Sequence, residues 1–344
     1  MGYRYIGSKA RIVNSIIEYI GTPESRSARF VDAMCGTGVV ACEAAKVGWS
    51  VVINDKMKNA TDISEARLLS IKEVKFEKLG GYQVVIDKLN AVKPVEGFFW
   101  KEYSPASVNF TPYERRYFTE GNAKLIDGIR IQIAEWYSNK EITEKEHTLL
   151  LANLMSATND VANIAGTYGC FLSKWTRQSQ RSLHMICSDL FTNTIEYKRS
   201  CNDVFELDCS LNDYVYIDPP YTKRQYASYY HILETIAQED EPTVEGVAGL
   251  RSWEKDSSVF CYKLKAQKAL VKLLNQLTAK KVILSYSDDG HVDIKSLKNE
   301  LYQTGSVEVI NLRSIGSYRP NQTAVTRKSQ VDEYLIVYMK GTQL

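Results

Sequence analysis

The chain has 344 residues, of which 44% are hydrophobic and 24% charged, a composition that supplies enough apolar material for a sizeable core. This excludes a disordered chain, a collagen-like fibre and a disulfide-stapled mini-protein. The net charge is only +2, so binding to nucleic acid has to be argued from local basic patches.

The seven cysteines are odd in number and form no CxxC pair, which indicates reduced thiols and no metal site. The N-terminal sequence lacks an apolar signal core, and no run approaches the roughly 20 apolar residues of a membrane span. We therefore expect a cytoplasmic protein that has no membrane partner.

The N-terminal part of the chain has the pattern of a nucleotide-binding sheet. Apolar residues at helical spacing predict a helix from about Ser8 to Gly21. A short strand over residues 28–34 then runs into the glycine turn Cys35-Gly36-Thr37-Gly38. We expect this turn to open a second helix, because Ala and Val dominate residues 39–47.

A second buried strand is predicted over residues 49–53, directly before Asn54 and Asp55. Strand, glycine turn, helix, strand and acid, in this order, are typical of the start of a parallel nucleotide-binding sheet. Residues 93–193 are mostly helical in pattern, and Thr143 with Glu146 forms a capping box before an apolar run.

The strand pattern resumes after this helical region, and one lysine-faced helix is predicted over residues 264–277. The further strands are expected at 195–200, 214–217, 281–286, 307–312 and 334–339. The predicted fold class is α/β: one Rossmann-like sheet, formed by residues 1–95 and 193–344, interrupted by a mostly helical insert over 96–192.

The glycine turn and Asp55 together indicate a cofactor that contains adenosine. Gly36 and Gly38 allow a ligand to approach the backbone, and Asp55 can accept hydrogen bonds from ribose hydroxyls. Each feature alone has a plain alternative, a tight turn without ligand or a helix N-cap, and Ala41 replaces the third glycine of GxGxxG. The pair does not separate a dinucleotide from S-adenosylmethionine.

The string Asp218-Pro219-Pro220-Tyr221 follows the strand 214–217, at the strand end where open α/β sheets bind ligands. An exocyclic amine is a poor nucleophile because its lone pair is delocalised into the ring. The Asp218 carboxylate and the Pro219 carbonyl can accept its two hydrogens, while Tyr221 offers a face for a planar base. Methyl transfer from a sulfonium fits this arrangement without a metal. The alternative is a rigid turn with a packed tyrosine.

The glycine turn, Asp55 and DPPY, in this order and with a large insert before DPPY, resemble the Dam-like (alpha-class) N6-adenine-specific DNA methyltransferases. The start, Tyr3-Arg-Tyr-Ile-Gly-Ser-Lys9, is similar to that family's N-terminal motif. The strings YIDPPYTKRQYASYYHILET, ANIAGTYGCFLSKW and ILSYSDDG resemble the branch of the FokI-type modification methyltransferases.

The resemblance implies an S-adenosylmethionine-dependent enzyme that methylates the N6 amine of a flipped-out adenine in double-stranded DNA at a specific site. It implies that 1–95 and 193–344 form the catalytic domain and that 96–192 recognises the target. The residues expected to bind the cofactor are Tyr5, Lys9, Asp32, Gly36, Gly38, Asp55, Asp203 and Asp218. The sequence departs from the family pattern at Met34, where Phe is common, and at Asn202, where Gly is usual.

Base flipping implies a DNA surface near the site. The basic residues expected on this surface are Lys174, Arg177, Lys223, Arg224 and Arg319, although for any single one of them a plain surface charge is a better explanation than a contact. The expected partners are double-stranded DNA and a cognate restriction endonuclease, in a monomeric enzyme associated with a prokaryotic nucleoid.

Other functions remain open. Methylation of RNA adenine or of a protein amide usually goes with Asn at the position of Asp218, and cytosine-5 chemistry needs a cysteine that usually follows proline. A silent DNA-binding module or a nicotinamide-dependent oxidoreductase leaves DPPY without a task.

Overall fold

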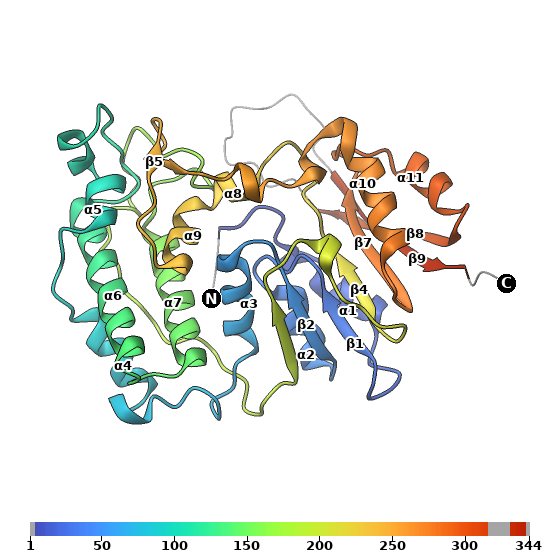
Figure 1. The fold of residues 1–344 in the computed structure, drawn as a ribbon, viewed down its shortest axis with the longest axis horizontal. Helices are drawn as coiled ribbons and strands as arrows, with labels where there is room; N and C mark the ends of the chain where they lie inside the picture. Colours follow the sequence, from blue (N-terminus) through green and yellow to red (C-terminus); the bar gives the residue numbers. More distant parts are fainter. Residues whose placement is uncertain (1–3, 316–330, 342–344) are drawn as a thin grey trace. The chain divides into compact units, whose positions relative to one another are not determined.

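The computed structural model describes residues 4–315 and 331–341 of the chain (Figure 1). Its main sheet has seven strands in the order β3-β2-β1-β4-β7-β9-β8. The strands are β1 (Arg29–Asp32), β2 (Ser50–Asn54), β3 (Tyr197–Ser200), β4 (Tyr214–Ile217), β7 (Lys281–Ser287), β8 (Gly305–Ile315) and β9 (Val331–Lys340). Strands β3, β2, β1, β4 and β7 pair in parallel, whereas β9 runs antiparallel to both β7 and β8.

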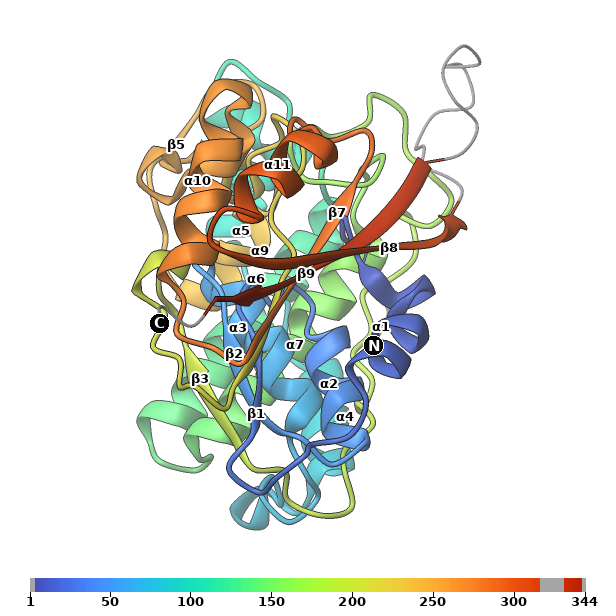
Figure 2. The same ribbon diagram turned by 90° about the vertical axis from the view of Figure 1, so that its right-hand side faces the viewer.

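Helices cover both faces of this sheet, and the central strands β1, β2, β4 and β7 are accordingly buried along nearly their whole length. Leu270, Leu273 and Leu297, from α10 (Lys263–Gln276) and α11 (Ile294–Leu301), pack on Val215 and Leu284. Figure 2 shows α11 and α1 (Val13–Ile20) on opposite sides of β8 and β9. Helix α2 (Val39–Lys46) packs against β1 and β2.

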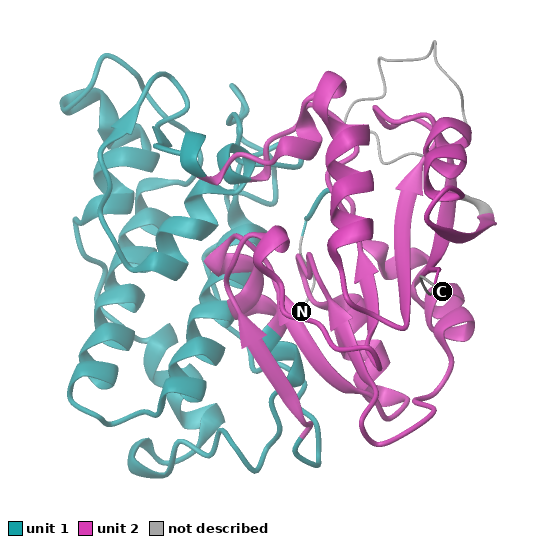
Figure 3. Cartoon of the chain, turned by 45° about the vertical axis from the view of Figure 1, so that its right-hand side comes forward, with its two compact units in different colours: residues 1–6, 65–194, 227–255 teal, residues 7–64, 195–226, 256–344 magenta. Residues whose placement is uncertain are grey.

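The chain divides into two compact units (Figure 3). Unit 1 contains residues 1–6, 65–194 and 227–255, and unit 2 contains residues 7–64, 195–226 and 256–344, including the seven-stranded sheet. Residues 65–95 and 227–255 thus pack with the helical unit, although the sequence pattern assigned them to the catalytic domain. The assignment of target recognition to residues 96–192 stays a prediction.

Unit 1 is mostly helical. Its longer helices are α4 (Tyr82–Asn90), α5 (Phe98–Tyr103), α6 (Glu120–Ser138), α7 (Glu144–Val161) and α9 (His231–Gln238), while α3 (Lys58–Leu68) begins in unit 2 and ends in unit 1. The predicted capping box is present at the start of α7: Thr143 accepts from the Glu146 N–H, and Glu146 accepts from the Thr143 N–H. A small hairpin, β5 (Val244–Glu245) and β6 (Leu250–Arg251), has no counterpart in the sequence prediction.

The predicted fold class is confirmed, and each predicted strand of the sheet lies within two or three residues of its position in the structure. Among the helices of the described residues, none is long and apolar enough to cross a membrane.

Candidate active site

Three acids lie at the carboxyl edge of the sheet, around its topological switch point. From the adjacent strands β1 and β4 the sheet continues in opposite directions, and open α/β sheets bind ligands at such a point. Asp32 ends β1, and its register partners are Ile53 on β2 and Tyr216 on β4. Asp55 and Asp218 each come two residues after these partners, so all three carboxyl groups reach the same edge.

The glycine turn after β1 has the backbone that its sequence predicts. Gly36 and Gly38 have φ angles of 51° and 70°, which side chains rarely allow. A Cβ atom on Gly38 would lie 2.6 Å from the Cα of Ser64, so only glycine fits there. The Gly36 N–H donates to Asp55 Oδ2 at 3.0 Å, which ties the turn to the end of β2.

Asp32 is fully buried beside this turn. Its Oδ2 accepts from the Ala41 N–H at 3.2 Å, whereas Oδ1 has no hydrogen-bond partner in the part of the chain that the structure describes. Burial raises the pKa of Asp32 well above the usual range, and the negative charge of Asp218 adds to this shift. An orphaned buried carboxylate oxygen beside a glycine turn fits a cofactor that brings a donor or a positive charge.

In the DPPY corner, the Asp218 carboxylate is contacted by Tyr221 and by Lys9, which begins the short helix η1 (Lys9–Arg11). Tyr221 donates its hydroxyl to Asp218 Oδ1 at 2.6 Å, and Lys9 Nζ lies 3.1 Å from the same oxygen. Burial raises the pKa of Asp218, and Lys9 opposes this shift. Within the described residues no hydrogen bond reaches Asp218 Oδ2, so this oxygen is available to a ligand.

Tyr221 is fixed from several directions. Its ring packs against Tyr286 with centroids 4.9 Å apart, and Lys9 Nζ lies 4.7 Å from the ring centroid. Its carbonyl accepts from the His291 N–H at 2.8 Å. These contacts fix the side chain beside Asp218, and its predicted stacking on a base stays a prediction.

Glu333 joins this cluster and was not found from the sequence. Its Oε2 lies 3.7 Å from Lys9 Nζ and 3.4 Å from the Tyr221 hydroxyl oxygen, whose proton is donated to Asp218. The pairing of β9 with β7 places Glu333 opposite Ser287, at the carboxyl edge of β7. An antiparallel strand brings its first residues to this edge, and no local pattern in the sequence reveals that direction.

The remaining predicted cofactor residues have the following surroundings. Asp203 caps the short helix η4 (Val204–Glu206) by accepting from the Phe205 N–H, and its Oδ2 lies 3.4 Å from Lys56 Nζ. Tyr5 belongs to unit 1, where its ring stacks on Tyr230 with centroids 4.2 Å apart. Their roles toward a cofactor stay predictions.

The basic residues chosen for DNA are all exposed where the structure describes them. Lys174 and Arg177 lie in unit 1, whereas Lys223 and Arg224 lie in unit 2. Arg319 lies outside the described residues. Exposure is necessary for a phosphate contact but does not demonstrate one.

The fold and the site define a Rossmann-like α/β protein with a glycine-lined cofactor edge and an acidic corner at its switch point. Residues 5–300 match the model of the D12 class N6 adenine-specific DNA methyltransferases, and the chain belongs to this family. The resemblance seen in the sequence motifs is thereby confirmed.

Curated relatives are similar along nearly the whole chain. The modification methylase StsI of Streptococcus sanguinis is 30% identical over 98% of this chain, and the type II methyltransferase M.FokI of Planomicrobium okeanokoites is 30% identical over 99%. The chain spans only 52% and 53% of the length of these two proteins. The type II methyltransferase M.NlaIII of Neisseria lactamica is 28% identical, over 89% of this chain and 90% of its own length.

Proposed function

We propose that the chain transfers a methyl group from S-adenosylmethionine to the N6 amine of a flipped-out adenine in double-stranded DNA, as the modification enzyme of a restriction-modification system. The observation that carries this proposal is the Asp218 carboxylate at the switch point, with one oxygen held by Tyr221 and Lys9 and the other available. The names of the relatives, which include two type II methyltransferases, support the proposal.

Several residues of the chain suit the cofactor. The glycine turn, whose Gly36 and Gly38 have positive φ angles, opens α2 at the carboxyl edge of the sheet, and Asp55 accepts from ribose hydroxyls. Asp32 Oδ1, which has no partner among the described residues, accepts a donor. When bound, S-adenosylmethionine supplies a methyl group activated by the sulfonium charge.

The chemistry of the chain's own residues concerns the amine. Asp218 Oδ2 accepts one hydrogen of the amine and the Pro219 carbonyl accepts the other, which draws the nitrogen toward tetrahedral geometry. Pro219 and Pro220 have fixed φ angles and no N–H that would compete for these acceptors. The target base has to leave the duplex stack to reach this corner. Positioning and electrostatics are then the main catalytic contributions.

The test measures transfer of labelled methyl groups from S-adenosylmethionine to duplex DNA by the full chain. We expect label on adenine N6, and a loss of at least about 10²-fold in Asp218→Asn, because the variant loses the charge that the amine needs. Asp208→Asn, an exposed control with the same chemical change, should keep wild-type activity.

Label in RNA or protein instead of DNA would assign a different substrate. DNA binding without turnover by both wild type and Asp218→Asn would identify a binding module. Modified-base sequencing of plasmid DNA from expressing cells would give the methylated site, and protection of that site from a nuclease would support a cognate endonuclease.

A further inference from the structure

We propose that Glu333, on the antiparallel strand β9, is a positioning residue of the methyl-transfer site: it shares Lys9 with Asp218 and so keeps Asp218 a strong acceptor for the target amine. This inference rests on the proposed function and adds a residue that neither DPPY nor the glycine turn contains.

The geometry makes Lys9 a shared cation. Its side chain is only 5% exposed, and its Nζ lies between Asp218 Oδ1 at 3.1 Å and Glu333 Oε2 at 3.7 Å. The Tyr221 hydroxyl bridges the same two carboxyl groups, at 2.6 Å from Asp218 and 3.4 Å from Glu333. Ser285 Oγ lies 3.4 Å from this hydroxyl and completes the cluster.

Among the residues that the structure describes, the charges around Lys9 do not balance. Lys9 faces two carboxyl groups directly, and a third, Asp32, interacts electrostatically with Asp218. Burial raises the pKa of Glu333, and the charge of Asp218 adds to this shift while Lys9 opposes it. Within residues 4–315 and 331–341, the titratable groups that face Glu333 and Asp218 are Lys9 on η1, Asp32 at the end of β1, Tyr216 on β4, Tyr221 after β4, and Asp289 after β7.

This imbalance has a direct consequence for Asp218. When an ammonium group pairs with a single carboxylate, it lowers the basicity of that carboxylate and makes the carboxylate a weaker hydrogen-bond acceptor. Because Glu333 takes part of the Lys9 interaction, Asp218 retains more negative charge for the amine. Glu333 acts through Lys9 and Tyr221 and does not itself touch the reacting atoms.

Glu333→Gln tests the inference, because it keeps the size of the side chain and removes its charge. We expect kcat for DNA methylation to fall about tenfold, with the KM for DNA and the calorimetric Kd for S-adenosylmethionine within threefold of wild type. The acid limb of the plot of kcat against pH should move to lower pH, because Lys9 then interacts with Asp218 alone and lowers its pKa further. Lys9→Gln should move this limb to higher pH, and Glu333→Asp should recover part of kcat.

Glu308→Gln on the neighbouring strand β8 is the matched control, since Glu308 is exposed. An unchanged kcat and pH profile in Glu333→Gln, with wild type active, would overturn the inference alone. A loss of activity accompanied by lost cofactor binding or lower thermal stability would show a purely structural role and would overturn it as well. A wild-type chain that methylates no DNA would instead refute the proposed function on which the inference rests.

Discussion

Asp32 is a single residue whose burial opposes folding while its position suits a ligand. It is fully buried, its Oδ1 has no partner among the described residues, and Asp218 is a nearby like charge. Buried carboxyl groups without a full set of hydrogen bonds occur mainly at functional sites. At other buried positions, apolar or fully hydrogen-bonded side chains are more stable. The electrostatic cost of Asp32 is therefore evidence for its predicted role in cofactor binding.

Asp32→Asn should be more stable than wild type near pH 8 and should bind S-adenosylmethionine more weakly. The pKa of Asp32 is raised in the folded chain, so its protonated form favours folding and its ionised form opposes it. The stability contribution of Asp32 is thus fully present below the unfolded pKa of about 3.9 and is lost as pH rises through the higher folded pKa.

The measurement is thermal unfolding of both chains from pH 4 to pH 8, without cofactor. We expect the melting temperature of Asp32→Asn to exceed that of wild type by about 1–3 °C at pH 8, for a difference of about one to two kcal/mol. The difference should vanish near pH 4. If Asp32→Asn and wild type had the same melting temperature at every pH, ionisation of Asp32 would not destabilise the folded chain.

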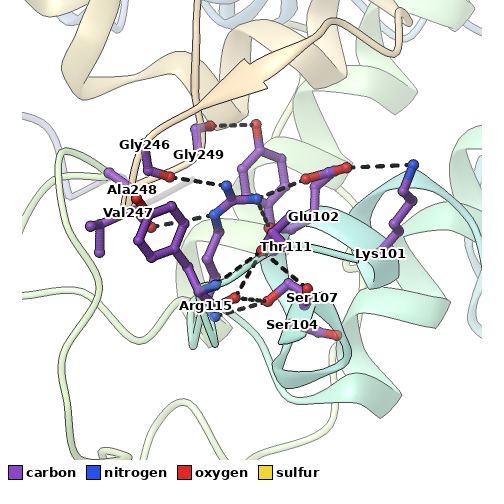
Figure 4. A network of polar contacts seen from close by, with 12 residues as sticks. Lys101, Glu102, Ser104, Ser107, Thr111, Arg115, Gly246, Val247, Ala248 and Gly249 are labelled. Atoms are coloured by element: carbon purple, nitrogen blue, oxygen red, sulfur yellow. Dashed lines mark hydrogen bonds and ion pairs between the residues drawn. The ribbon is translucent and has the colours of Figure 1, made fainter. Parts of the chain in front are cut away.

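At the scale of elements, the hairpin β5–β6 depends on one buried arginine. Arg115 is 2% exposed, and its guanidinium lies 2.7 Å from Glu102 on α5 (Figure 4). It also donates to the carbonyls of Gly246 and Val247 at 3.0 and 3.3 Å. The Tyr103 hydroxyl donates to the carbonyl of Gly249 at 3.2 Å. The two-residue strands alone are too short for independent stability, so these contacts hold the hairpin on unit 1.

Arg115→Met should destabilise the chain by about 3–5 kcal/mol, because it removes the closer of the two cations beside the buried Glu102 carboxylate and the hydrogen bonds to three carbonyls. Limited proteolysis should then cut within residues 244–251, and thermal unfolding should shift to lower temperature. The neighbouring Arg116→Met is the control, since its pair with Glu114 is more exposed and should contribute little. An intact hairpin in Arg115→Met would contradict the role of Arg115.

The elements also show which parts of the fold a sequence can reveal. The apolar runs of β4 and β7 and the capping box of α7 are local signals, and the structure contains all three as predicted. The hairpin β5–β6 was missed because two-residue strands have no periodicity, and its stability comes from Arg115, more than 130 residues earlier. The position of Glu333 depends on strand direction, which a single sequence does not encode locally.

The candidate site follows the same division. Asp55 and Asp218 were predictable because each follows a recognisable strand, and parallel strands end at one edge. Asp32 was assigned to the cofactor through the family resemblance. The partners that adjust their charge, Lys9 and Glu333, come from opposite ends of the chain. Lys9 was predicted through the family resemblance alone, and its contact with Asp218 is visible only in the folded chain.

At the scale of the whole molecule, the balance of charge predicts how DNA binding depends on salt. The chain carries a net charge of only +2, so attraction to DNA has to come from a few exposed cations rather than from the overall field. Lys223 and Arg224 are exposed and follow Tyr221 by two and three residues. For the proposed function, we expect the phosphates of a DNA strand whose base enters the DPPY corner to come within reach of these two side chains.

The double variant Lys223→Ala/Arg224→Ala should bind duplex DNA more weakly and less salt-dependently. Each lost phosphate contact lowers the slope of log K against log salt by about 1, so the slope should fall by about 2. Fluorescence anisotropy between 50 and 300 mM salt measures it. The control, Lys46→Ala/Lys280→Ala, removes the same charge at the amino edge of the sheet, where Lys46 and Lys280 pair with Glu43 and Glu24. Equal slopes in the two double variants would mean that only net charge matters and that Lys223 and Arg224 do not contact the phosphates.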